Sequence, residues 1–174
     1  AQDKVGHAFA LYTILQEELG GEDPDVVAFR RNEKDFKCCH LLEYPIGEYD
    51  FTIARHFLFD TAEILRYELL MRSSFTPLAR LAKKIHGELK YHVLHANSWL
   101  TRLGQGTDES HSRMQFALNF AFPLALGIFE ESPFEKELIE QKIFPGENAL
   151  QELWEEKIHG IIDRAQLEIP QVKD

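Results

Sequence analysis

The sequence has little cysteine and no excess of positive charge. Its two cysteines, Cys38 and Cys39, are adjacent, and there is no Cys-x-x-Cys pair. Neighbouring cysteines rarely bridge each other, so we expect no disulfide and a reducing, cytoplasmic compartment. The formal net charge is −10 at pH 7. Because nucleic acids and anionic membranes require a basic face, we expect neither as a partner.

Long apolar runs and glycine-rich loops are also missing. The sequence has no apolar run of a length that would span a bilayer, and no signal-peptide pattern opens it. It also contains no phosphate-binding loop, dinucleotide fingerprint or nucleophile elbow. No segment alternates with the period of a strand over more than a few residues. The 174 residues are 44% hydrophobic, enough for one buried core. We therefore predict a single all-α domain over residues 1–174.

The chain opens directly on an apolar helical pattern. This pattern starts at Ala1 and stops at Gly20 and Gly21, which are strong helix-ending signals. A helix with no N-cap leads us to expect further sequence before it. Its apolar stripe consists of Val5, Ala8, Phe9, Tyr12, Leu15 and Leu19.

Further helices follow along the chain. Apolar periodicity predicts long helices over residues 50–73, 77–103 and 148–166, and another that Thr107 caps and Pro123 should kink or break. The connection from residue 22 to residue 49 is long, which distinguishes the topology from a simple up-down bundle. Short helices are predicted over residues 25–32 and 36–44, after Ser132-Pro133, and in the segment up to Phe129.

The candidate chemistry lies in the two consecutive long helices. Asp60 sits among apolar residues, and His92 lies at nearly the same height on the next helix. Such a facing pair either holds a metal or forms a buried hydrogen bond. A di-iron bundle requires Glu-x-x-His on two of its helices. His7 and His92 instead follow Lys4 and Leu89, and neither side chain can replace an anionic ligand. We therefore expect no metal and no catalytic residue.

Three interpretations of these residues remain. In the first, Lys4 supplies the charge that a metal would have supplied and pairs with Asp60, and both histidines complete a hydrogen-bonded cluster. In the second, Asp3 and Glu88, four residues before the histidines, complete an active metal site. In the third, the residues never meet. The first interpretation is the most economical, because it satisfies every buried polar group.

The remaining chemical motifs favour structural roles. Glu156 and His159 form the one true Glu-x-x-His, but they lie off the apolar stripe of their helix and indicate a solvated face. That stripe contains Leu150, Leu153, Trp154 and Ile158. Cys38 and Cys39 stand beside His40, with no Asn or Asp spaced to orient the imidazole. We interpret both cysteines as partly buried residues of the long connection.

Five segments together resemble the PaaC family, the C subunits of bacterial phenylacetyl-CoA 1,2-epoxidases. They are Q-D-K-V-G-H-A-F-A-L-Y, D-F-T-I-A-R-H-F-L-F-D, E-L-K-Y-H, R-L-G-Q-G-T-D-E-S and A-Q-L-E-I-P. The resemblance covers nearly the whole chain without the family's N-terminal helix. It implies a ferritin-like four-helix-bundle core with extra C-terminal helices. At the matching positions, Lys4 and Leu89 stand where the catalytic relative has ligand glutamates, and His7, Asp60 and His92 match ligand positions.

The resemblance also implies a function. The chain would be a non-catalytic structural subunit of a soluble multicomponent monooxygenase that epoxidises phenylacetyl-CoA in aerobic phenylacetate catabolism. It would hold no cofactor, would bind and stabilise the catalytic di-iron subunit of that complex, and would contact further epoxidase subunits. A homodimer is an additional arrangement. The rival functions are an active di-iron oxygenase or ferritin-like metal-binding protein, and a stand-alone helical binding module. Phe116, Phe120 and Phe122 are among the residues that could build an apolar partner face.

Overall fold

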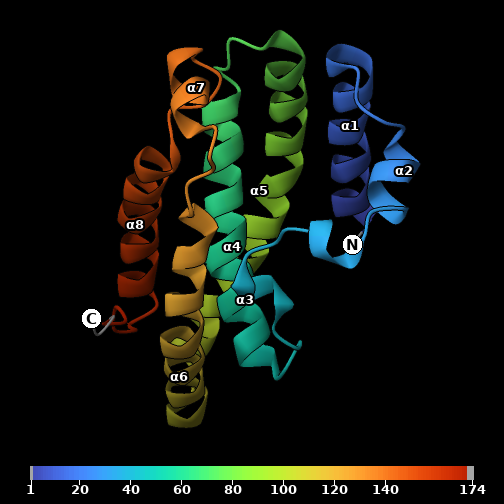
Figure 1. Cartoon of the computed structure of the whole chain (residues 1–174). Coiled ribbons are helices and arrows are strands. Elements are labelled where there is room, and N and C mark those ends of the chain that lie inside the picture. Colours follow the sequence, from blue (N-terminus) through green and yellow to red (C-terminus); the bar gives the residue numbers. More distant parts are fainter. Residues whose placement is uncertain (1, 172–174) are drawn as a thin grey trace.

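The computed structural model describes residues 2–171. Ala1 and residues 172–174, which belong to the predicted first helix and to the predicted domain, lie outside the described residues. Within that range the chain forms eight α-helices, two short 3-10 helices and no strand (Figure 1). The predicted all-α, ferritin-like class is confirmed. None of the helices in this part of the chain is long and apolar enough to cross a membrane.

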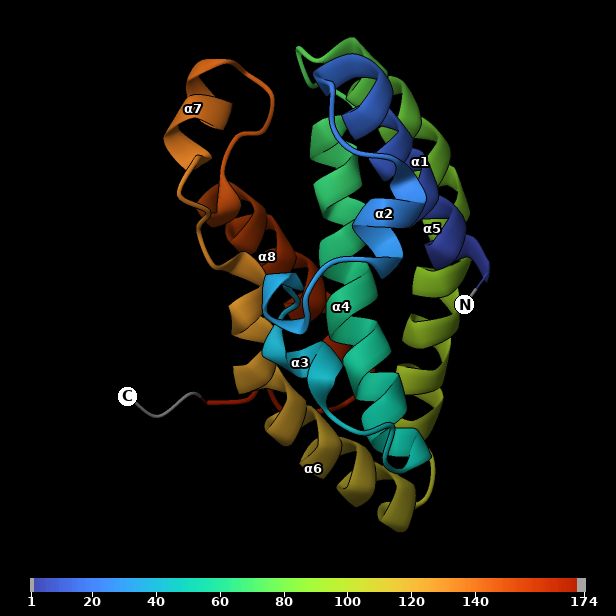
Figure 2. The ribbon, with the colours of Figure 1, turned by 45° about the vertical axis from the view of Figure 1, so that its right-hand side comes forward.

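Four long helices form the main body of the fold. α4 is central, and it contacts the other three. Figures 1 and 2 show α5 beside α4, with α6 and α8 on the other side of α4. Because the apolar stripes of all four helices converge on one core, most of the fold's apolar burial comes from these elements. The four helices are α4 (Tyr49–Leu70), α5 (Thr76–Gly104), α6 (Asp108–Ala125) and α8 (Glu147–Arg164).

Trp154 on α8 is the largest side chain of this core. It is fully buried, and its Nε1 donates a hydrogen bond to the backbone oxygen of Leu58 on α4 (2.9 Å). Its ring stacks on Phe122 of α6 and contacts Phe129. The predicted stripe of α8 is confirmed except at Leu153, which is 41% exposed. Leu153 is about 100° of helical rotation away from Trp154, so it points away from the core.

α6 does not break at Pro123. The helix continues two residues further to Ala125, and the 3-10 helix η2 (Leu126–Phe129) follows. Proline removes one backbone hydrogen bond near the end of the helix, where few are lost. The buried neighbours Ala121, Phe122 and Ala125 hold this last turn against the core. α7 (Glu135–Glu140) then leads into α8.

α1 (Gln2–Leu19) lies along the outside of α5 (Figure 2). Within this helix His7 is the one buried residue. The predicted apolar stripe exists, but Val5, Phe9, Leu15 and Leu19 are exposed by 42–70%. A helix that is apolar on most of its faces is typical of a buried element, so this stripe is a candidate contact surface.

The long connection from α1 to α4 contains little regular structure. It holds α2 (Pro24–Phe29), the 3-10 helix η1 (Glu33–Asp35) and α3 (His40–Glu43). The helix predicted over residues 36–44 is therefore only one turn long. Leu41 anchors that turn, because it is fully buried in the main core.

Candidate functional site

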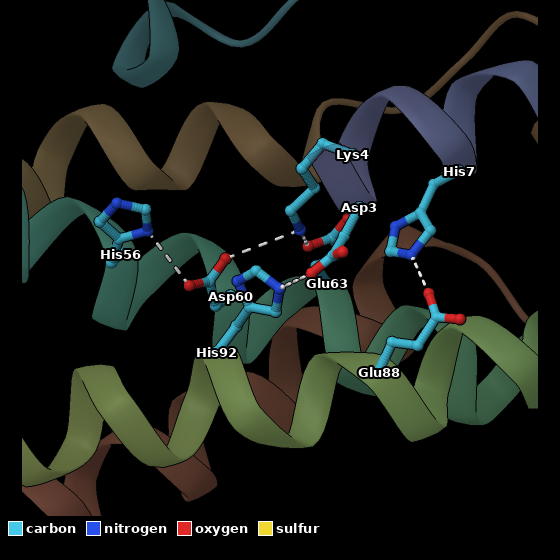
Figure 3. A network of polar contacts seen from close by, with 8 residues as sticks. All are labelled: Asp3, Lys4, His7, His56, Asp60, Glu63, Glu88 and His92. Atoms are coloured by element: carbon cyan, nitrogen blue, oxygen red, sulfur yellow. Dashed lines mark hydrogen bonds and ion pairs between the residues drawn. The ribbon is translucent and has the colours of Figure 1, made fainter. Parts of the chain in front are cut away.

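Polar side chains gather where α1 meets α4 and α5 (Figure 3). On α4, His56, Asp60 and Glu63 recur at helical spacing and therefore share one face. Asp60 is only 2% exposed. A carboxylate this deeply buried requires a charged or hydrogen-bonding partner. The structure supplies such partners from α1 and from α4 itself.

Lys4 provides the positive charge at the centre of this cluster. Its Nζ lies 3.8 Å from Asp60 Oδ1 and donates a closer hydrogen bond to Glu63 Oε2. The ion pair that the sequence suggested between Lys4 and Asp60 is confirmed. Glu63 was not among the predicted residues, although its position three residues after Asp60 on the same helix is a usable signal. One ammonium is therefore shared by two carboxylates.

The two histidines predicted for this cluster pair elsewhere. His7 Nε2 donates to Glu88 Oε2 (2.7 Å), and His92 Nε2 donates to Asp3 Oδ2 (3.0 Å). The two pairs are reciprocal: α1 runs antiparallel to α5, so each histidine meets the carboxylate four residues before the other. The prediction that His7 and His92 join Lys4 and Asp60 in one cluster is wrong. Asp3 and Glu88, considered as metal ligands, serve instead as partners of the imidazoles.

Asp60 finds its imidazole partner on its own helix. His56 Nδ1 donates to Asp60 Oδ2 at 3.2 Å. The predicted facing of Asp60 by His92 is therefore wrong. The two residues were matched by height along the helix pair, which does not fix the rotation of each helix. His92 is turned toward α1 and its side chain is 23% exposed.

Leu89 contributes no polar atom to the cluster. It is fully buried in a second, smaller apolar core with Tyr67, Ala82 and Ile85, between α4 and α5. It thus replaces a polar position with packing. Within residues 2–171, no three His, Cys, Asp or Glu side chains come together as a group that could hold a metal ion.

Comparison with known proteins places this geometry in a family. A family model described as "Phenylacetic acid catabolic protein" matches residues 1–174. The chain belongs to the phenylacetic acid catabolic protein family. It is also 32% identical over 169 residues to a protein of Escherichia coli strain K12 that is named as the C subunit of 1,2-phenylacetyl-CoA epoxidase. That alignment covers 97% of this chain and 68% of the relative. The resemblance to the PaaC family is confirmed.

In this member of the phenylacetic acid catabolic protein family, the other chemical motifs lie outside the polar cluster. Glu156 is exposed, in agreement with a solvated face of α8. Cys39 is half-buried as predicted, but Cys38 is exposed, because it lies in an irregular stretch before α3. Burial raises the pKa of both thiols, and nearby Glu43 raises that of Cys38 further. Both cysteines are therefore less nucleophilic than an ordinary cysteine at neutral pH.

Tyr67 makes the stability of this family member depend on alkaline pH. Burial, with a contribution from the Glu63 carboxylate, raises its pKa to about 12. A folded-state pKa above the unfolded value of 10.0 favours the neutral phenol in the native state. We expect the free energy of unfolding to hold up to about pH 10 and to fall between about pH 10 and 12. Urea unfolding across this range checks it, and Tyr67→Phe should flatten the decline. An unchanged decline in Tyr67→Phe would contradict this assignment.

Proposed function

We propose that this chain is a non-catalytic structural subunit of a multicomponent di-iron monooxygenase that epoxidises phenylacetyl-CoA. In this proposal it binds and stabilises the catalytic di-iron subunit and contacts further subunits of the epoxidase. The name of the E. coli relative, the C subunit of an epoxidase, supports the choice of complex. The observation that carries the non-catalytic role is the position of Lys4 between Asp60 and Glu63.

The charges around Lys4 do not fit a di-iron pair. A di-iron site needs several carboxylates and two imidazoles that project toward a common point. Here the ammonium of Lys4 neutralises the carboxylates of Asp60 and Glu63, and it would repel a metal cation at the same place. Both histidines are already hydrogen bonded to carboxylates outside this point. The cluster therefore supports a role in holding α1 against α4 and α5.

Exposed apolar side chains support the partner-binding half of the proposal. Large apolar patches on a protein surface are typical of contact sites, and stable hetero-complexes bury surfaces that resemble a divided core. On α6, Phe116 is 74% exposed and Phe120 is 44% exposed. Phe122, which the sequence grouped with them, is buried against Trp154 and belongs to the core. The α1 stripe adds a second such surface.

The proposal is tested by metal content and by complex formation. The chain is expressed in iron-replete medium, purified and subjected to elemental analysis, alone and after co-expression with the di-iron subunit of the same complex. We expect a negligible iron content in the chain alone and co-elution of the two subunits on a sizing column. About two iron atoms per chain would instead indicate an active di-iron oxygenase or a ferritin-like metal-binding protein.

A further inference from the structure

A cavity of about 600 Å³ opens beside the polar cluster. Asp60, which is 2% exposed, lies at its deep end together with Lys4 and Glu63. Ile46, which is 71% exposed, lies at its outer edge. The cavity is bounded by α4 on one side and by the segment around α3 on the other. We call it the Asp60 pocket.

The floor of the Asp60 pocket has one uncompensated acceptor. Two carboxylates share the single ammonium of Lys4, which donates its hydrogen bond to Glu63. Its Nζ stands 3.8 Å from Asp60 Oδ1, beyond hydrogen-bond distance. His56 donates to the other oxygen, Oδ2. None of the residues 2–171 donates a hydrogen bond to Oδ1 of Asp60. Such a buried carboxylate oxygen favours an added donor, preferably a cation.

Arg55, the remaining cation of the lining, is occupied elsewhere. Its Nη1 donates to the backbone oxygen of Tyr44 (3.0 Å), and its guanidinium lies over the ring of Phe51 at 5.5 Å from the centroid. It therefore closes part of the outer wall and leaves the acceptor on Asp60 unmatched. The deep end of the pocket carries more negative than positive charge, because His56 is the one other titratable group there.

Apolar side chains surround the mouth of the pocket and extend over α6. Tyr44 lines the pocket, and its ring also contacts Phe120 at a centroid distance of 5.4 Å. Phe116 lies one helical turn before Phe120 on the same face of α6. These side chains form one continuous surface, which we call the Tyr44 patch. It consists of Leu42, Tyr44, Ile46, Phe116 and Phe120, and four of the five are at least 41% exposed.

We propose that the Asp60 pocket and the Tyr44 patch together form the docking surface for the catalytic di-iron subunit. That subunit inserts an arginine or lysine side chain toward Oδ1 of Asp60 and covers the Tyr44 patch with apolar side chains. This inference rests on the proposed function. An apolar ring around one desolvated charge is the layout of a binding hot spot, in which a complementary basic anchor carries much of the affinity. The α1 stripe, by contrast, contains no charged member.

The test compares matched variants in binding to the purified di-iron subunit by surface plasmon resonance. Ile46→Asp and Phe116→Asp place a charge on the Tyr44 patch, and Asp60→Asn removes the charge of the pocket while keeping its shape. Phe9→Asp places the same charge on the α1 stripe, at a side chain that is 59% exposed, and serves as the control. We expect each of the first three to weaken affinity by about tenfold or more, and Phe9→Asp to change it by less than about twofold.

The outcomes separate this inference from the proposed function. If the unmodified chain does not bind the di-iron subunit, both fail. If it binds and the Tyr44 patch variants bind equally well, or Phe9→Asp alone weakens binding, the docking surface is wrong and the proposed function stands. If the patch variants weaken binding but Asp60→Asn does not, the basic anchor is wrong. The patch positions are exposed, so unchanged thermal unfolding of those variants confirms that a loss of affinity is not a loss of fold.

Discussion

Replacing Trp154 with alanine is expected to lower the free energy of unfolding by about 3–5 kcal/mol. The indole is fully buried, contacts Phe122 and Phe129, and donates to the backbone oxygen of Leu58. Removal of the ring empties the point at which α4, α6 and α8 meet. For a chain of this length the melting temperature should fall by roughly 10 °C. Circular dichroism during heating and in urea measures both quantities.

Two control substitutions sharpen the test of Trp154. Leu153→Ala, at the exposed neighbouring position, should cost less than about 0.5 kcal/mol. Trp154→Phe keeps an aromatic ring but loses the Nε1 donor, so its cost should fall between those of the two alanine variants. If Trp154→Ala were no more destabilising than Leu153→Ala, the core described around Trp154 would be incorrect.

Replacing Lys4 with methionine is expected to cost about 2–3 kcal/mol of unfolding free energy. The substitution leaves the carboxylates of Asp60 and Glu63 close together with no cation between them. Breaking a fully buried ion pair costs about 3–5 kcal/mol, and the lower figure reflects solvent screening of the Lys4 side chain, which is 36% exposed. Urea unfolding of the single variant gives the cost directly.

A double-mutant cycle separates charge from packing at Lys4. Glu63→Gln removes one of the two carboxylates, so Lys4→Met should cost less in that background by about 1 kcal/mol or more. Lys83→Met, at an exposed position of α5, should be close to neutral and controls for the loss of a lysine. Equal costs of Lys4→Met with and without Glu63 would show that the shared ammonium does not stabilise the cluster.

Much of the fold could be predicted because its signals are local. The apolar spacing of α4, α5 and α8 and the Gly20-Gly21 stop place these helices within a few residues of their observed bounds. Thr107 caps α6 as expected, since its side chain accepts from the Ser110 backbone N–H. Pro123 misled because the buried side chains around it outweigh the loss of one hydrogen bond.

The candidate site could be predicted only in part. The charge of Lys4 and the apolar setting of Asp60 were enough to pair them. The partners of His7 and His92 depend on how α1 is rotated against α5, and a sequence does not contain that angle. His56 and Glu63 could have been found, because both lie one helical turn from Asp60. The exposure of the α1 stripe could not, since an apolar stripe indicates that something covers it and not whether that element belongs to the same chain.

The shallow seat of α1 sets how the isolated chain opens. Every residue of Gln2–Leu19 is described, and His7 alone is buried, so α1 is attached mainly through the ion pairs of Lys4, His7 and Asp3. Such a helix opens as a separate cooperative unit at a free energy well below that of global unfolding. Its backbone amides should exchange with deuterium while those of α4 and α8 stay protected. High salt, which screens the attaching charges, should accelerate that exchange selectively in α1.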